Sequence, residues 1–183
     1  MNGAAEQIDT PADSQTAPAD GPVQDNRAAA ESIVKNSVIA AMSVGLIPIP
    51  AVGLLGLVAT NVTMLQSISK LYGVPFKQEL ARSAVFALVG GLLPVSLGVG
   101  FSELLKLIPG FGSVAGAAGT SVLAGAVTYG VGRTFVEHFE EGGTFLSLDI
   151  ARLRKTFTFE FNRGRKVAEE MAPAAEKPAA EKT

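Results

Sequence analysis

The chain has 183 residues, which suits one domain, and 48% of them are hydrophobic, a fraction close to the average for soluble proteins. The formal net charge of −2 gives no reason to expect nucleic acid as a partner. With no cysteine and one histidine, the sequence excludes disulfides, cysteine-metal sites and the usual pairs of nucleophile and base. We therefore expect no enzymatic activity and no cofactor.

The first segment, residues 1–26, has five acidic residues and neither lysine nor arginine. It is rich in Ala, Pro and Gln, so it buries too little apolar surface to offset the entropy of ordering. Residues 172–183 are again Ala, Pro, Glu and Lys. We expect both tails to be disordered, with a helical domain over residues 27–148 and an amphipathic segment over residues 149–171.

Three stretches carry no charged residue, namely Asn36–Ser69, Ser83–Ser102 and Leu107–Gly132. Each exceeds the roughly 18 residues at which a membrane-spanning helix becomes the default interpretation. Prolines interrupt them, because proline removes a hydrogen-bond donor and disfavours helix at the preceding residue. The sequence therefore predicts an all-α fold with two tandem apolar helical hairpins in or on a membrane.

The first hairpin is expected to turn at Pro48 and Pro50, and to end at Gly73, which can adopt the left-handed conformation that closes a helix. Its predicted arms run from an N-cap at Asp25 or Asn26 to Leu46, and from Ala51 to Tyr72.

The second hairpin is expected to turn at Pro109 and to stop at the glycine pair that follows Glu141. Pro94 lies inside its first arm and predicts a kink there. The predicted arms are Phe76–Ile108 and Ser113–Glu141.

The depth of insertion differs between the hairpins. Residues 36–47 supply twelve uncharged positions, fewer than the roughly 20 that a helix needs to span a bilayer. A hairpin that crossed the bilayer would expose its apolar corner, Ile47–Pro50, to water on the far side. A hairpin that enters the bilayer and returns to the same side therefore fits the sequence better. The second hairpin carries Glu103 and Lys106, which could face water on the far side.

Cations follow the apolar runs and cluster in two regions. By the positive-inside rule, both regions belong on the cytoplasmic side of the inner membrane, and both termini then lie there too. The residues are Lys70, Lys77, Arg82, Arg133, Arg152, Arg154, Lys155, Arg163, Arg165 and Lys166.

The last apolar run has small residues at four-residue spacing, which lets two helix backbones approach closely. The spacing predicts either self-association into a homo-oligomer or packing against the chain's own helices. The candidate packing glycines are Gly112, Gly116, Gly119, Gly125 and Gly130.

Two other motifs give weaker signals. Gly110–Gly116 is similar to a phosphate-binding glycine loop, but no strand precedes it and no lysine follows it, so we reject that reading. His138 lies beside Glu137, Glu140 and Glu141. This group predicts either a weak divalent-cation site or, in our preferred interpretation, a solvated helix end.

The segment Ile150–Glu170 mixes cations with phenylalanines. As a helix, it has one face with Ile150, Leu153, Phe157 and Phe161, while Arg154, Lys155 and Arg165 lie elsewhere. The candidate membrane-surface residues are Arg152, Arg154, Lys155, Phe157 and Phe161. Such a helix would lie on an anionic membrane surface, or its apolar face would pack on the bundle. The alternation over residues 156–161 is also typical of a short strand, although we favour the helix.

Several runs resemble a known family. They are Asn36–Ala41, Pro48–Pro50, Thr60–Val62 and Leu107–Gly112. Over about residues 30–150 the chain resembles the domain of unknown function found in YcjF-like membrane proteins and alongside Era-like small GTPase domains. The resemblance implies a helical membrane module and a GTPase partner, and it brings no catalytic residues.

We consequently expect a membrane-embedded adaptor or scaffold that binds the lipid bilayer, self-associates and recruits a cytoplasmic GTPase. The alternatives are a small oligomeric channel or membrane-permeabilising module, and a soluble helical bundle whose apolar hairpins form its core.

Overall fold

The computed structural model describes residues 21–47, 50–91 and 114–172. These residues form helices and no strand, so the predicted all-α class is confirmed. The expected disordered tails, the kink at Pro94 and the turns at Pro48 and Pro109 lie mostly or wholly outside the described residues. The helices are α1 (Gly21–Gly45), α2 (Pro50–Leu71), α3 (Gln78–Gly91), α5 (Val114–Glu140) and α6 (Ile150–Met171).

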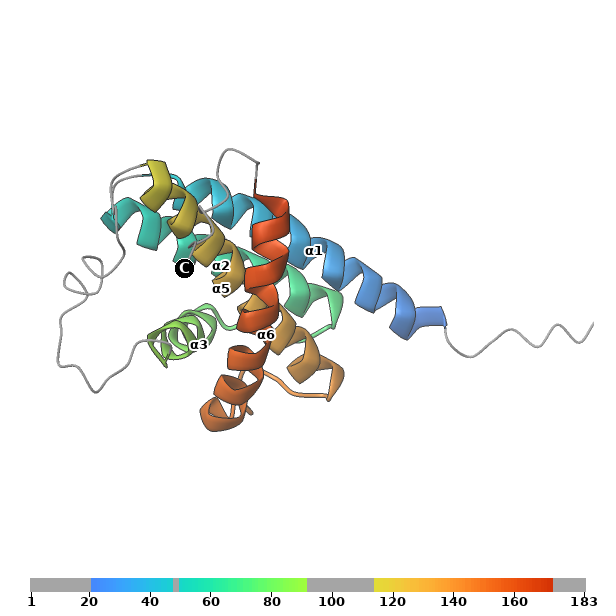
Figure 1. The fold of residues 1–183 in the computed structure, drawn as a ribbon. Helices are drawn as coiled ribbons and strands as arrows, with labels where there is room; N and C mark the ends of the chain where they lie inside the picture. The colour runs from blue at the N-terminus through green and yellow to red at the C-terminus, as the bar shows by residue number, and fades with distance from the viewer. Residues whose placement is uncertain (1–20, 48–49, 92–113, 173–183) are drawn as a thin grey trace, which may run out of the picture.

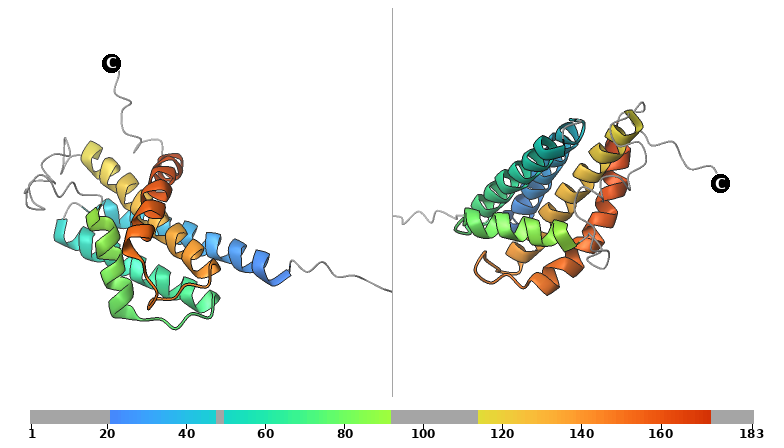
Figure 2. Two further views of the ribbon diagram at one scale, coloured as in Figure 1. Left: turned by 90° about the horizontal axis from the view of Figure 1, so that it is seen from below. Right: turned by 90° about the vertical axis from the view of Figure 1, so that its left-hand side faces the viewer.

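Helix α5 is the centre of the molecule. It packs against α1 on one side and against α6 on the other, and these two contacts are the most extensive in the structure. Helices α1 and α2 lie side by side behind it, and α3 lies against α2 and α6 (Figures 1 and 2). The described part of the chain is thus a layered bundle in which α5 separates the α1–α2 pair from α6.

Glycines end two of the helices as the sequence predicts. Gly73 follows α2 with φ of +66°, and the N–H of Val74 donates to the carbonyl of Ser69 at 2.8 Å. Gly142 follows α5 with φ of +79°, and the N–H of Gly143 donates to the carbonyl of His138 at 2.9 Å. Both are left-handed caps that satisfy carbonyls the helix leaves free, a role that favours glycine.

The bounds of α1 and α2 differ from the predicted arms of the first hairpin at some positions. Helix α1 begins at Gly21, earlier than the N-cap expected at Asp25 or Asn26, and it ends at Gly45. Helix α2 begins at Pro50 itself, because the first position of a helix has no hydrogen bond for proline to remove. Pro50 therefore starts the second helix and does not sit in the turn.

The segment from Ile150 is a helix, and the strand alternative for residues 156–161 is wrong. Asp149 is its N-cap, with Oδ1 accepting from the N–H groups of Ala151 at 2.9 Å and Arg152 at 3.2 Å. The carboxylate satisfies two donors that a helix start otherwise leaves unpaired. This local signal outweighs the alternation of Thr and Phe.

The described parts of the expected second hairpin do not pair closely. Helices α3 and α5 touch only marginally, whereas α5 packs along α1 and α6. The physical reason is the shape of α5, whose small residues admit two neighbours closely, one on each side. Residues 78–91 therefore do not form one closely paired arm of the expected second hairpin with α5.

The core is apolar with a few buried polar side chains. Asn61 of α2 is fully buried and donates through Nδ2 to Thr128 Oγ1 of α5 at 3.2 Å. Ser121 of α5, also buried, donates to the carbonyl of Met42 in α1 at 2.9 Å. Each bond joins helices far apart in the sequence, so each fixes how one helix is aligned with the next.

Candidate functional site

One end of the bundle carries no charge, and we call it the uncharged end. It consists of the last part of α1 from Ser43, the first part of α2 to Leu57, and the first part of α5 to Leu123. Large apolar side chains there face outward, including Leu55, 62% exposed, and Leu123, 41% exposed. The other exposed apolar side chains at or beside this end are Ile39, Leu46, Ile47 and Val52.

Close backbone contacts hold this end together. A Cβ added at Gly45 would lie 2.8 Å from Ser121 Cα and 2.9 Å from the carbonyl oxygen of Thr120. A Cβ at Gly56 would lie 2.6 Å from Val44 Cγ1. Such distances leave room only for hydrogen, so glycine lets α1 and α5 touch through their backbones.

Helix α2 is the one described helix that is long and apolar enough to cross a membrane, over Val52–Leu71, with a mean hydropathy of 1.4. About a third of that stretch, 33%, is buried by the rest of the protein. Length and composition therefore permit a span, and the remainder, which is exposed or half-buried, includes Val52 and Leu55 of the uncharged end.

The opposite end of the bundle is charged and joined by ion pairs. Arg27 Nη2 of α1 lies 3.6 Å from Glu140 Oε2, and Arg152 Nη2 of α6 lies 2.7 Å from Glu141 Oε1. Tyr72, just after α2, donates its hydroxyl to Glu140 Oε1 at 3.0 Å. Four helices thus meet at the end of α5. Surface pairs of this kind add little stability, but they mark an end that water must reach.

Burial, together with the hydrogen bond to Glu140 and the negative charge of that carboxylate, raises the pKa of Tyr72 to about 12. Each cause disfavours the phenolate: burial removes water from the anion, the hydrogen bond to Glu140 requires the phenol proton, and the carboxylate repels a second negative charge.

Only some of the candidate packing glycines, which we call the glycine stripe of α5, pack inside the chain. A Cβ at Gly125 would lie 2.7 Å from Met42 Cγ and 3.0 Å from Ala168 Cβ. A Cβ at Gly130 would lie 2.9 Å from Phe157 Cε2. These two glycines therefore serve internal packing, against α1 and α6.

The remaining glycines of the stripe differ. A Cβ at Gly119 would meet nothing within 4 Å, so this position is open to another molecule. Gly112 lies outside the described residues, and the surroundings of Gly116 are not described.

Besides Gly45 and Gly56, two more packing glycines were not predicted from the sequence. A Cβ at Gly164 of α6 would lie 2.9 Å from the carbonyl oxygen of Ala126, and one at Gly132 would lie 2.7 Å from Val34 Cγ2. Gly164 is isolated among charged residues, so no spacing pattern signals it. Its place on the same face as Leu153 and Phe157 was the available clue.

Phe157 needs a correction. We expected it at a membrane surface, but it is 1% exposed and packs against Gly130 of α5. Phe161 is half-buried beside it, with ring centroids 6.1 Å apart. The apolar face of α6 is used by the bundle itself, which was the alternative reading.

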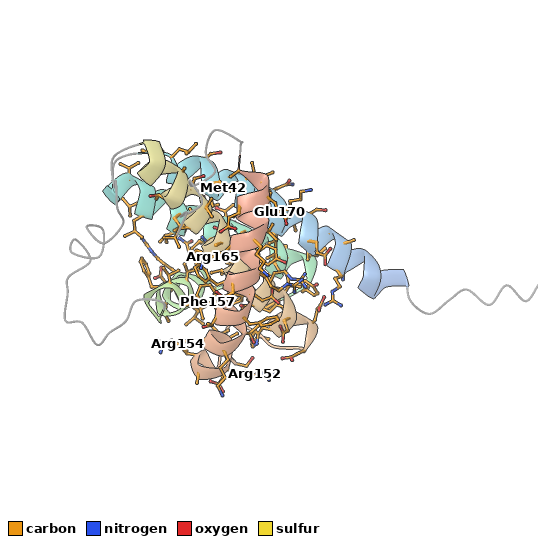
Figure 3. All side chains as sticks on the ribbon, viewed as in Figure 1. Met42, Arg152, Arg154, Phe157, Arg165 and Glu170 are labelled. Carbon is orange, nitrogen blue, oxygen red and sulfur yellow. The ribbon has the colours of Figure 1, made fainter. Side chains whose placement is uncertain are left out.

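The cations predicted for the same surface are exposed, as Figure 3 shows for Arg152 and Arg154 near the start of α6. Lys155 is exposed as well. Arg154 Nε donates to the carbonyl of Ala87 at 3.3 Å, which ties α6 to α3. These three cations lie at the charged end, away from the uncharged end.

His138 has a structural contact in place of a metal site. Its Nε2 lies 3.1 Å from the carbonyl oxygen of Thr144, across the turn between α5 and α6. No group of three or more His, Cys, Asp or Glu side chains converges within the described residues. His138 is therefore a half-buried support for the turn, and the solvated helix end is only partly right.

Comparison with known proteins places these features in a family. Residues 22–163 match the family described as a domain of unknown function (DUF697). The chain is 37% identical, over 140 residues, to magnetosome membrane protein 22 of Magnetospirillum gryphiswaldense, covering 76% of this chain and 72% of that protein. No solved structure matches the chain.

The glycine contacts predict opposite effects for two alanine substitutions. Gly164→Ala should destabilise the protein by about 1–3 kcal/mol, because the new methyl group meets a backbone carbonyl that cannot move aside. Gly119→Ala should be neutral or stabilise by up to about 1 kcal/mol, because alanine favours helix and meets nothing. Chemical denaturation followed by circular dichroism measures both. Equal effects would show that the close contact at Gly164 does not exist.

Tyr72 predicts a pH dependence at the alkaline limit. Because its pKa rises from 10.0 to about 12 on folding, the folded state holds the proton more tightly. The resulting stability is fully present below pH 10.0 and is lost as the pH rises through about 12. In Tyr129→Phe, which leaves one tyrosine, tyrosinate absorbance should appear only near the top of this range.

Glu140→Gln in the same background should lower that pKa, because it removes the negative charge facing the phenol. An unchanged titration would mean that Glu140 does not contact Tyr72 in solution.

Proposed function

Because the chain belongs to the DUF697 family, and its matched relative is named as a membrane protein, we propose that it is a non-enzymatic, membrane-associated scaffold whose uncharged end enters the lipid bilayer. The observation that carries the proposal is the outward-facing apolar surface of that end, with Leu55 at its most exposed point. Several exposed apolar side chains at one end of a bundle are typical of a membrane or protein contact.

Helix α6 limits how deeply this arrangement can enter the hydrocarbon. Ala168 of α6 packs at Gly125 of α5, so the charged outer face of α6 extends to that level. Exposed ionic side chains such as Arg165 and Glu170 are costly in hydrocarbon. From Gly125 to the start of α5 at Val114 is about 17 Å, roughly half of a hydrocarbon core of about 30 Å.

That length supports entry into one leaflet and return, the behaviour expected of a re-entrant hairpin. It argues against a full crossing by α2 while α6 stays in place. The inner, cytoplasmic membrane with both termini on the cytoplasmic side then follows from the positions of the cations, since Arg27, Lys70 and Arg152 all lie at the charged end.

The scaffold role rests on two free surfaces. Gly119 and the exposed Leu123 lie on α5 where a second copy of the chain could pack, which would form the homo-oligomer. At the charged end, Arg152, Arg154 and Lys155 are offered to a cytoplasmic partner. A GTPase is the partner that the family resemblance implies.

The soluble bundle is the second candidate, and one observation favours it. Helix α6 covers a large part of the charge-free run of α5, so much of that run is core. The exposed apolar side chains at the uncharged end favour the membrane proposal because they lie together where the chain has no charge, whereas Leu146 and Phe159 are exposed singly in charged segments.

A lysine at the uncharged end should remove the protein from the membrane. Leu55→Lys places a charge, costing about 3 kcal/mol, where the proposal requires hydrocarbon, and the exposed position keeps the fold intact. We expect wild type in the carbonate-washed membrane pellet and a loss of about tenfold or more for the variant.

Leu146→Lys is the matched control, because Leu146 is 79% exposed on the turn at the charged end. It should fractionate like wild type. Wild-type protein in the soluble fraction without detergent, or equal fractionation of all three proteins, would overturn the membrane proposal and favour the soluble bundle.

The topology predicts that reporter domains fused at Met1 and at Thr183 are both active only on the cytoplasmic side. The reason is that the cations near both ends of the helical domain resist transfer across the membrane. Activity of either fusion on the opposite side would rule out this orientation.

A further inference from the structure

A groove of about 450 Å³ lies between α1 and α6, with α5 as its floor. Helices α1 and α6 contact each other only slightly, so both keep a side open to this space. Lys35 of α1, Arg133 of α5 and Arg163 of α6 contribute cations to its lining. None of the sequence motifs pointed to this groove, because the cations come from three separate helices.

The polarity of the groove changes along its length. Val34 packs at Gly132 and Met42 packs at Gly125, so α1 runs toward the uncharged end from Glu31 onward. Arg133 and Lys35 therefore lie farther from the uncharged end, whereas Val38, Val167 and Met171 line the part nearer to it. A cationic part thus leads into an apolar part.

The cations keep donors for a ligand. Arg133 is 16% exposed and meets Glu31 through Nη1 at 3.2 Å, while its Nε is buried without a hydrogen-bond partner among the described residues. Lys35 is exposed and forms no ion pair with any described residue. Arg163 contacts Glu160 at 3.2 Å and is 55% exposed.

Two carboxylates also line the groove. Glu31 is already engaged by Arg133, and Glu170 lies on α6 near the apolar part, as Figure 3 shows toward the end of that helix. Arg133 is paired with Glu31 and Arg163 with Glu160, so Lys35 and Glu170 are the lining charges without an ion pair among the described residues. The N–H donors that the three cations leave unused, including the buried Nε of Arg133, can bind an anion. The site suits an anion with an apolar extension better than a cation.

We propose that this groove binds the anionic phosphate headgroup of a phospholipid, with the lipid's apolar part against Val38, Val167 and Met171. The inference rests on the proposed membrane association, which sets the level of the groove. Lys35 is seven residues from Met42, about 10 Å along α1, and Met42 marks the limit of the uncharged end. Headgroups extend several ångströms beyond the hydrocarbon, so the cations lie at the headgroup level.

The test uses the purified full-length chain in a non-ionic detergent, titrated with dihexanoyl-phosphatidylglycerol by calorimetry. Saturable binding of one lipid per chain is expected. Lys35→Gln and Arg163→Gln should each weaken it about tenfold, the loss expected for one charge-assisted hydrogen bond. Glu170→Gln should tighten it severalfold, because a repelling carboxylate is removed.

Lys77→Gln is the matched control, since Lys77 is exposed on the connection between α2 and α3, outside the groove. It should bind like wild type. If Lys35→Gln and Arg163→Gln also bind like wild type, the groove is not the lipid site and the proposal fails.

Inorganic phosphate separates a lipid site from a general phosphate site. It should not compete at concentrations where the lipid saturates the protein, because it lacks the apolar part. Equal binding of inorganic phosphate would overturn the assignment to lipid. Membrane association that resists carbonate should survive Lys35→Gln and Arg163→Gln. If wild-type protein does not associate with membranes, the proposed function fails. If wild-type protein associates with membranes but does not bind the lipid, only this inference fails.

Discussion

The fold depends on the close approach of α5 to two helices at once. Gly130 admits the ring of Phe157 from α6, Gly132 admits Val34 from α1, and Gly164 brings the α6 backbone against the carbonyl of Ala126. A Cβ at any of these points would lie less than 3.0 Å from a neighbouring atom, so a larger residue would force the neighbouring side chain or helix to shift. Without this contact, α6 would lose its most extensive packing surface and the charge-free run of α5 would be more exposed. Glycine is unfavourable in an isolated helix, so tertiary packing must supply the compensation.

Local features could be read from the sequence, because their causes are local. Gly73 and the glycines after α5 end helices through their own conformational freedom, and Asp149 starts one through its own carboxylate. The amphipathic character of α6 was equally visible. The sequence could not show what the apolar face of α6 contacts. Phe157 lies on that face in either case, whether the opposing surface is lipid or protein. Deciding that required the position of Gly130, which is 27 residues earlier in the chain and is not revealed by the periodicity of α6.

The candidate surfaces show the same division. The uncharged end follows from the distribution of charge along the chain, and the exposed Leu55 lies within a run that the sequence already marked. The groove between α1 and α6 has no such signature, because Lys35, Arg133 and Arg163 are each unremarkable in their own segments. Tertiary structure alone brings them together. The small residues of α5 could be recognised from their four-residue spacing. Which of them pack inside the chain, as Gly125 and Gly130 do, and which do not, as with Gly119, depends on the helices that lie against α5.

The charged outer face of α6 has a mechanical consequence. Since it reaches the level of Gly125, it would stop the bundle at the depth of one leaflet in the membrane-bound arrangement that we propose. An inclusion confined to one leaflet enlarges the area of that leaflet without enlarging the other. Such an area difference bends the membrane, and amphipathic inclusions of this kind accordingly bind better where curvature already spreads the headgroups apart. Because the length of α6 limits the depth of insertion, it would also make the amount of bound protein depend on the curvature of the membrane.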